Sequence, residues 1–229
     1  MDAIVLENIP FQIDIDFLMK RLRINEKSNY ANELKHIAYD AQTIAKPKAL
    51  YKVAFIESKG DDYVVVDGIT LTSRVLRVNL DQAHRVFAFV ATCGLELEKW
   101  ANCISDVLQS YWVDTIKEMG LQLARKTLED HLSEHHHPGR ISRMNPGSLA
   151  DWPIQQQKEL FKILGNTEDR IGVRLTESLL MVPIKSVSGI FFPTEESFVS
   201  CQLCPREICP GRKAPYDKDL YDRKYRKTS

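Results

Sequence analysis

The sequence predicts an α+β fold, because helical and strand patterns are mixed along it without a regular alternation. Apolar residues at helical spacing cover residues 30–45, and a second helical region extends from Leu95 to His137. Between them, two β-rich runs flank Asp67-Gly68, a dipeptide that strongly indicates a tight hairpin. A repeated strand–helix–strand order would instead indicate a doubly wound parallel sheet. We therefore expect the 229 residues to form one large α+β domain.

The first half of the chain supplies one helix and several strands. The helix is expected to end before Pro47, and its apolar positions are Tyr30, Leu34, Ile37, Ala38, Ala41, Ile44 and Ala45. LYKVAFIE, residues 50–57, alternates like a strand, and YVVVDGITL, residues 63–71, predicts the hairpin. RVFAFVATCG, residues 85–94, fits a buried strand or a short buried helix, which periodicity alone does not distinguish.

The second half predicts two consecutive helices over residues 95–137, then a further helix and two strands. For the later helix, Asp151 is expected to be the cap, Pro153 lies near the first turn, and Gly165 marks the end. The two strands are expected in GVRLTES, residues 172–178, and in GIFFPT, residues 189–194, on either side of LLMVPIKSVS.

The domain organisation is expected to be simple. We predict one domain over residues 1–229, with a softer seam near residue 73 that could set off an N-terminal lobe, residues 1–73. A Cys-rich segment, residues 197–217, follows the last expected strand. The polar residues 218–229 are expected to form a frayed tail.

Composition and charge exclude several functional classes. Hydrophobic residues make up 44% and charged residues 27% of the chain, which is ordinary for a globular protein. The 31 basic residues balance 31 acidic ones, so no overall field attracts nucleic acid or an anionic membrane. The first residues lack the basic and apolar regions of a signal peptide. We therefore expect a cytoplasmic protein, in which five cysteines, an odd number, argue against a disulfide framework.

Three cysteines are spaced as in a metal site that lacks its last ligand. Cys201, Cys204 and Cys209 follow the pattern C-x2-C-x4-C among prolines and a glycine, residues that make tight turns. Zinc knuckles and iron–sulfur clusters both use such short loops, and both normally take four protein ligands. The pattern therefore predicts a zinc ion or an iron–sulfur cluster at these cysteines, and free thiols in an ordered loop are the alternative.

A histidine-rich stretch, HLSEHHHPGR, contains the H-x-x-E-H pattern of one class of zinc peptidases. His131 and His135 lie four residues apart, so on a helix their rings can meet one metal ion, with Glu134 between them. A peptidase also needs a third protein ligand, which we do not find in the sequence. We therefore favour a polar helix end, where histidines lie near the negative pole of the helix dipole.

Two further segments combine turns and small hydroxyl residues. In GRISRMNPGSLADWP, the guanidinium of Arg143 can pair with a ligand carboxylate while Gly147 allows close backbone approach. An ordinary Pro-Gly turn after an edge strand is the alternative. Farther along, Leu-Thr-Glu-Ser at 175–178 and Ser-Val-Ser-Gly at 186–189 punctuate two apolar strands. They let a flat ligand lie close, or they simply join two core strands.

These two segments, in this order, resemble the reactivation domain of cobalamin-dependent methionine synthase. That family carries an Arg-x-x-x-Gly-Tyr turn, then Gly-x-x-Leu-Thr-Glu-Ser, Met-x-Pro and Ser-Val-Ser-Gly. The counterparts here are residues 143–147, Gly172 with 175–178, Met181 with Pro183, and 186–189. The resemblance covers residues 140–200 and is closest to stand-alone bacterial methionine synthase activation proteins, which also end in a Cys-rich segment. It implies an α+β fold with a twisted antiparallel sheet and surrounding helices.

The resemblance implies a role in the reductive reactivation of a cobalamin-dependent methionine synthase or a related corrinoid methyltransferase. In the family, S-adenosylmethionine binds against a corrinoid carried by a partner, and an electron donor protein allows methyl transfer to cobalt. Whether this chain is itself an enzyme stays open. By resemblance, Arg143 clamps the carboxylate of S-adenosylmethionine. The other residues expected around the cofactor are Pro146, Gly147, Ser148, Glu177, Ser186, Ser188, Ser197 and Phe198.

The chain departs from the family pattern at three places. The family's Tyr after the glycine is Ser148 here, an aromatic pair falls on Ser197 and Phe198, and a helical Glu falls on Gln122. Losing a ring and a carboxylate weakens the binding of a cationic sulfonium. The alternative function is therefore a non-catalytic docking module for a corrinoid protein. The Cys-rich segment is an addition to the family plan, and one hypothesis is an iron–sulfur cluster there that delivers the electron.

Overall fold

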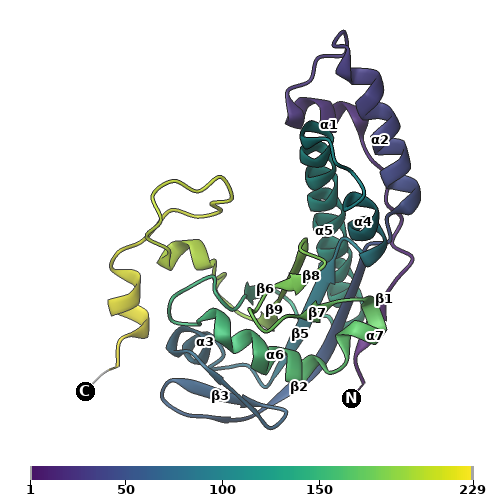
Figure 1. Cartoon of the computed structure of the whole chain (residues 1–229). Coiled ribbons are helices and arrows are strands. Elements are labelled where there is room, and N and C mark those ends of the chain that lie inside the picture. Colours follow the sequence, from purple (N-terminus) through teal and green to yellow (C-terminus); the bar gives the residue numbers. More distant parts are fainter. Residues whose placement is uncertain (1, 228–229) are drawn as a thin grey trace.

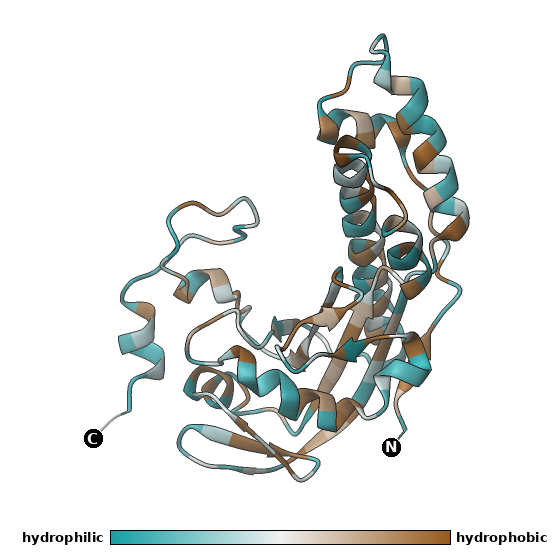
Figure 2. Ribbon diagram, viewed as in Figure 1, coloured by the Kyte–Doolittle hydropathy of each residue, from teal (hydrophilic) through white to brown (hydrophobic). Residues whose placement is uncertain are grey.

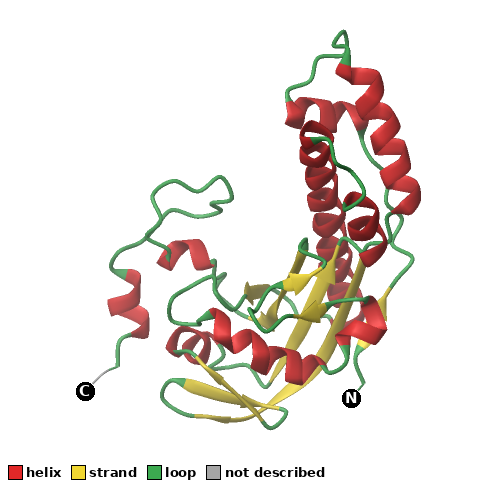
Figure 3. Ribbon diagram, in the orientation of Figure 1, coloured by secondary structure: helices red, strands yellow, loops and turns green. Residues whose placement is uncertain are grey.

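The structure is a computed structural model that describes residues 2–227. Its main feature is a seven-stranded sheet in which all neighbouring strands are antiparallel (Figure 3). The order is β4-β3-β2-β5-β9-β6. β1 pairs with residues 49–51 of β2, and β3 pairs with residues 56–59 of the same strand. The strands are β1 (Ile4–Leu6), β2 (Lys48–Lys59), β3 (Tyr63–Val66), β4 (Ile69–Thr72), β5 (Arg85–Thr92), β6 (Ile141–Met144) and β9 (Ser186–Pro193). A separate hairpin consists of β7 (Arg174–Leu175) and β8 (Met181–Val182).

Helices cover both faces of this sheet, and some of them extend beyond it. In Figure 1, α3 (Arg74–Asn79), α6 (Gln157–Leu164) and α7 (Thr167–Ile171) lie in front of the sheet, while the second half of α5 (Val107–His136) lies behind it. The first half of α5 projects outward with α1 (Ile15–Leu22), α2 (Tyr30–Ile44) and α4 (Leu95–Ala101) as a helical arm. The expected α+β class, with an antiparallel sheet and surrounding helices, is confirmed. No helix in residues 2–227 has the length and apolar character needed to cross a membrane.

Strand β5 shows how the sequence fills the core. It pairs with β2 on one side and β9 on the other, so both edges of its backbone are satisfied. Val86, Ala88 and Val90 pack into the layer under α6, and the alternate residues Phe87 and Phe89 pack under α5. Because both faces are covered, residues 86–91 of the strand are all apolar, and the central strands in Figure 2 are mostly brown. This explains why periodicity alone left a strand and a helix equally open.

The hairpin expected at Asp67-Gly68 is present between β3 and β4. Both residues have positive φ, 46° and 76°, as this tight turn requires. The Asp67 carboxylate also accepts the backbone N–H of Phe55 at 2.9 Å and pairs with Lys52 at 2.8 Å. The turn is therefore attached to β2 as well as to its own strands.

Asp151 does not cap the helix that follows it, which corrects the expectation from the sequence. Its carboxylate instead accepts hydrogen bonds from the Ser73 hydroxyl and from the backbone N–H of Val75, at the start of α3. The following helical region begins with a 3-10 turn, η1 (Ile154–Gln156), whose N-terminal flanking residue is Pro153. Asp151 therefore caps a helix that is distant in the sequence, although its local pattern predicts a cap for the next helix.

The two ends of the chain also differ from expectation. Strands β2, β3 and β4 belong to the main sheet, so a seam at residue 73 would cut through a continuous layer. Where a frayed tail was expected, a π-helical turn, η3 (Tyr221–Tyr225), packs against α3 and buries Tyr225 to 1% exposure. The last two residues of that expected tail, 228–229, lie outside the described residues.

Candidate functional site

Two neighbouring cavities flank the turn that follows β6. The first, which we call the Arg143 pocket, measures about 520 Å³ and lies between β6, the end of α5 and the Cys-rich segment. The second, the Ile184 pocket, measures about 490 Å³ and lies between the turn, η1 and the loop around β8. Asn145 and Ser148 line both cavities. Two molecules bound in the two pockets would therefore be neighbours, separated by these shared residues.

Close backbone packing holds the turn in place. Asn145 donates from Nδ2 to the carbonyl oxygen of Ser188 in β9 at 2.6 Å. A Cβ atom on Gly189 would lie 2.4 Å from the carbonyl oxygen of Met144, so only glycine allows this approach. Gly147 has φ +82°, and its N–H donates to the carbonyl of Trp152 at 2.8 Å. The glycines of both motifs are thus explained by the geometry of one turn.

Arg143 projects from β6 into the first pocket. Its Nη1 lies 3.1 Å from Oε1 of Glu129 on α5, and its guanidinium carbon lies 5.8 Å from the centre of the Phe191 ring. Burial lowers the pKa of Arg143, nearby Arg125 lowers it further, and Glu129 opposes both effects. The guanidinium is half-buried and faces a cavity, so it can pair with the carboxylate of a ligand.

The Cys-rich segment adds further positive charge to this pocket. Lys213 and Arg206 both line it. Burial lowers the pKa of Lys213, as do the charges of Arg125 and Arg143. Among the described residues that line the pocket, Glu129 is the only carboxylate. The pocket is therefore positive overall and contains a single fixed anion.

The Ile184 pocket is mainly apolar with a polar floor. Leu180 and Ile184 stand at its rim with 64% and 68% exposure. On the floor, Gln157 is 2% exposed and donates from Nε2 to the Ser188 hydroxyl at 3.2 Å. Its Oε1 is buried without a hydrogen-bond partner. Exposed apolar side chains next to a buried acceptor are typical of a surface that is covered in a complex.

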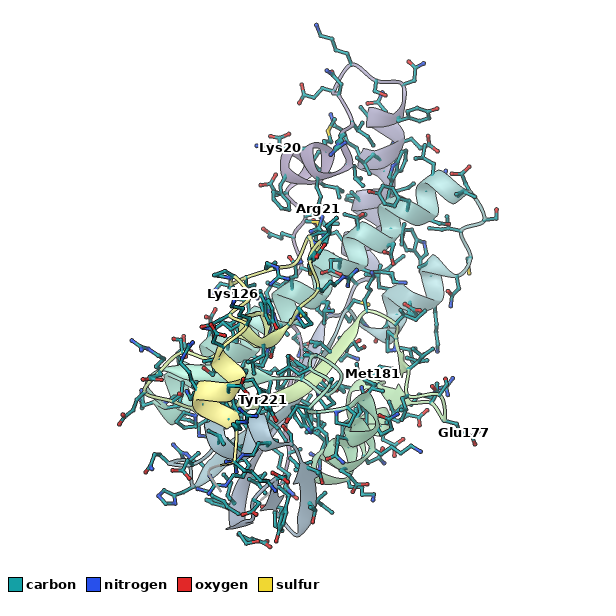
Figure 4. The ribbon with its side chains drawn as sticks, turned by 90° about the vertical axis from the view of Figure 1, so that its left-hand side faces the viewer. Lys20, Arg21, Lys126, Glu177, Met181 and Tyr221 are labelled. Atoms are coloured by element: carbon teal, nitrogen blue, oxygen red, sulfur yellow. The ribbon has the colours of Figure 1, made fainter. Side chains whose placement is uncertain are left out.

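The structure distributes the predicted cofactor residues over both pockets. Arg143, Ser197 and Phe198 line the first pocket, and Ser148 lines both. The members found only in the second pocket are Pro146, Gly147, Ser186 and Ser188. Glu177 is in neither, because it lies on the exposed turn of the β7–β8 hairpin and points outward (Figure 4). The prediction of Glu177 as a cofactor ligand therefore finds no support in this geometry.

The three cysteines line the Arg143 pocket together, but their side chains are not grouped as metal ligands in the described residues. Within residues 2–227, no group of three His, Cys, Asp or Glu side chains is arranged to hold a metal ion. Instead, the Arg212 guanidinium donates to the carbonyl oxygens of Cys201, Cys204, Arg206 and Ala214. Cys201 Sγ accepts the Lys213 N–H at 3.4 Å. The expected zinc or iron–sulfur site at Cys201, Cys204 and Cys209 is thus not supported, and we derive no step from it.

The histidine motif has a structural role in this geometry. The Tyr51 hydroxyl lies 3.1 Å from Nε2 of His131 and 2.9 Å from Nε2 of His136. His135 turns back to the carbonyl of His131 at 3.0 Å through Nδ1. The three rings therefore make hydrogen-bond contacts within the protein at the end of α5. This agrees with the polar helix end that the sequence favoured.

Glu129 and Lys213 are not among the site residues that the sequence predicts. Gln122, where the resemblance places the loss of a helical carboxylate, is exposed on α5 and donates to Glu118 at 3.0 Å. Glu129 lies two turns farther along α5 and pairs with Arg143 across 14 residues. The sequence pattern does not predict this ion pair, because the pair depends on how the loop between α5 and β6 orients the two elements.

Comparisons with known proteins agree with the geometry. Residues 128–201, about a third of the chain, match the sequence profile of the vitamin B12 dependent methionine synthase activation domain. The fold is similar to that in the crystal structure of the MetH reactivation domain bound to AdoHcy, with a TM-score of 0.57 and 16% identity. That match covers 86% of this chain and 81% of the other. No curated protein matches the sequence.

These findings confirm the resemblance that the motifs predict. The matched residues run from the second half of α5 to the first cysteine, so they include β6, the turn and β9. They contain Glu129 and Arg143 and both sides of the turn between the pockets. The similarity to the solved structure extends over most of the chain and shows a shared fold. Residues 202–217 of the Cys-rich segment lie outside the part of the chain that the profile matches.

Proposed function

We propose that this protein, which carries the activation-domain segment of vitamin B12 dependent methionine synthase on the corresponding fold, helps to reactivate a corrinoid-dependent methyltransferase. The profile match and the fold support a role in reactivation. The finer assignment is an accessory protein, cytoplasmic as the sequence predicts, that presents S-adenosylmethionine to a corrinoid bound by a partner. The partner is methionine synthase or a related methyltransferase.

The single observation that carries this proposal is Arg143 in its pocket. A half-buried guanidinium that projects into a cavity of about 520 Å³ is suited to clamp the carboxylate of S-adenosylmethionine. The solved structure of similar fold contains AdoHcy, the product that S-adenosylmethionine becomes after losing its methyl group. Glu129 provides a carboxylate in the same pocket, although the aligned position, Gln122, has lost one.

The neighbouring Ile184 pocket supports a partner next to the methyl donor. Methyl transfer requires direct contact between donor and acceptor, and the two pockets share Asn145 and Ser148. The exposed Leu180 and Ile184 would be covered when a protein-bound corrinoid docks. This apolar rim is the surface that we assign to the partner.

The proposed reaction balances in two steps. An electron from a donor protein reduces the partner's oxidised corrinoid from cob(II)alamin to cob(I)alamin. The cobalt electron pair then attacks the sulfonium methyl group, the carbon–sulfur bond breaks, and AdoHcy leaves. The residues of this chain would orient the donor and exclude water, since the sulfonium and the cobalt supply the chemistry.

The second candidate is a docking module that performs no methyl transfer. One observation favours it: the Arg143 guanidinium is already paired with Glu129, so a ligand carboxylate must compete with a fixed one. Such a module would bind the corrinoid protein through the same apolar rim. Binding of S-adenosylmethionine separates the two candidates.

We would titrate the purified protein with S-adenosylmethionine by anaerobic calorimetry and compare the Arg143→Ala variant. The first proposal expects saturable binding that weakens about tenfold or more in this variant, because a charge-assisted pair with a carboxylate is lost. Arg140→Ala is the matched control, since Arg140 lies just before β6 and donates instead to the carbonyl of Glu195 at 2.7 Å. The titration is repeated with a corrinoid-loaded partner.

The outcomes separate the candidates. Wild-type binding that Arg143→Ala loses and Arg140→Ala keeps would support presentation of the methyl donor. Binding of the partner without any binding of S-adenosylmethionine, alone or in the complex, would support the docking module. Equal losses in both variants would remove Arg143 from the proposed site.

A further inference from the structure

We propose that Glu129 recognises the α-ammonium group of the ligand while Arg143 binds its α-carboxylate, so that the pair selects a complete amino-acid group. This inference rests on the proposed function, because it assigns a residue to the same pocket. It goes beyond that function by naming what sets the pocket's specificity.

The first argument is the shape of the ion pair. The Arg143 Nη1 and Glu129 Oε1 atoms are 3.1 Å apart and come from β6 and α5, two elements that both line the pocket. In an amino acid the carboxylate and the ammonium group are attached to one carbon. They therefore present opposite charges at a spacing similar to that of this pair. A ligand of this kind can replace one ion pair with two.

The second argument is that Glu129 keeps a partner when Arg143 turns to a ligand. Arg125 lies one helical turn before Glu129, with its Nη1 3.8 Å from Glu129 Oε1. Glu129 therefore still has an opposite charge nearby when Arg143 turns to a ligand. This avoids leaving an uncompensated carboxylate when the ligand binds.

The third argument is electrostatic. Arg143, Arg206 and Lys213 line the pocket, and Arg125 lies close enough to affect the pKa values of Arg143 and Lys213. These cations alone favour any carboxylate and disfavour an ammonium group. Glu129 is the only described lining residue that reverses this preference locally. Without it, we expect a ligand that lacks the ammonium group to bind better than one that has it.

The experiment compares two probes on the full-length protein. One is AdoHcy, which has both charges, and the other is its deaminated analogue, which keeps only the carboxylate. Dissociation constants are measured for the wild type, Glu129→Gln, Glu129→Asp and Asp130→Asn. Asp130 is the matched control, because it is the next carboxylate on α5 and pairs with Lys126 at 2.8 Å, away from Arg143. Thermal unfolding midpoints verify that each variant is folded.

In the expected result, Glu129→Gln weakens AdoHcy at least about tenfold and leaves the deaminated analogue unchanged or tighter, as loss of a charged hydrogen bond predicts. Glu129→Asp keeps part of the preference, and Asp130→Asn behaves as the wild type. Equal weakening of both probes, or no weakening of AdoHcy, would overturn the inference and leave the proposed function standing. If the wild type binds neither probe, alone or with a corrinoid partner, the proposed function falls and this inference falls with it.

Discussion

The Tyr51 hydroxyl lies between two histidine rings in the layer where α5 packs on the sheet. Tyr51 is 1% exposed, and its oxygen contacts Nε2 of both His131 and His136. When both rings are neutral, the hydroxyl can donate to one nitrogen and accept from the other. Burial is the main cause that lowers the pKa of each histidine, and neighbouring positive groups add to it. The folded protein therefore prefers these rings without a proton.

This preference predicts a loss of stability in mild acid. The unfolded histidines bind protons near their usual pKa of 6.5, whereas the folded ones bind them only at lower pH. Below about pH 7 the unfolded state thus holds more protons, so the free energy of unfolding falls as the pH falls and levels off below the folded pKa. We expect His136→Gln, which can still bond to Tyr51 but does not titrate, to reduce this slope in urea unfolding measured from pH 8 to 5.

The control for the acid effect is a histidine outside this cluster. His36→Gln removes an exposed ring of α2 and should leave the slope unchanged. If the two variants show the same pH dependence as the wild type, the cluster does not contribute to it. Any loss of stability between pH 8 and 5 then comes from groups outside this cluster.

At the scale of elements, one arginine connects distant parts of the Cys-rich segment. Four carbonyl groups of the segment converge on the Arg212 guanidinium, which has five N–H donors in a planar fork. They belong to residues spread from 201 to 214, so one side chain closes the loop. Leu203 and Cys204 pack against the core, but residues 205–208 are exposed, so we expect the order of this part of the loop to be local.

Arg212→Ala should therefore open this loop without unfolding the protein. We expect limited proteolysis to cut the segment between residues 204 and 213 several times faster than in the wild type, because local opening costs less than global unfolding. The thermal midpoint should change little. Arg206→Ala is the control, since it removes an exposed guanidinium from the same loop. Equal cleavage rates in the two variants would show that Arg212 does not hold the loop.

Elements were easier to predict from the sequence than the contacts between them. The helix expected to end before Pro47 and the hairpin at Asp67-Gly68 are confirmed, because both depend on local spacing and turn chemistry. Asp151 also has the local appearance of a helix cap, but its carboxylate bonds to the start of α3. A cap residue satisfies whichever free N–H groups the fold brings near, and the sequence does not show which ones these are.

At the scale of the whole molecule, the site depends on contacts between distant segments. The motifs located Arg143 and the turn, because their spacing is carried by one continuous stretch. Glu129 and Lys213 reach the same pocket from α5 and from the C-terminal segment, and both lie outside the two motifs that carry the resemblance. The part of the site that was missed is thus the part that tertiary packing assembles. The same holds for the C-terminal tail, which looks polar yet has one buried anchor.

That anchor, Tyr225, joins three parts of the molecule. Its hydroxyl donates to Asn79 Oδ1 at 3.0 Å, and its carbonyl oxygen accepts from Arg74 Nε at 2.9 Å, both at α3. Its ring meets the Phe198 ring edge-on at 6.3 Å, where the Cys-rich segment begins. Figure 4 shows η3, which begins at the labelled Tyr221, below that segment. The tail therefore fixes the start of the pocket wall to the α3 side of the sheet.

We expect Tyr225→Ala to lower the free energy of unfolding by about 3 kcal/mol, as for other buried aromatic side chains, and Tyr225→Phe by about 1 kcal/mol through the lost hydroxyl bond. Tyr216→Ala, which removes a tyrosine that is 47% exposed in the same segment, should cost less than about 0.5 kcal/mol. Urea unfolding followed by tryptophan fluorescence measures all three. If Tyr225→Ala matched Tyr216→Ala, the tail would not belong to the cooperative unit. A large loss would instead mean that the C-terminal turn stabilises the fold and so holds Phe198 at the pocket.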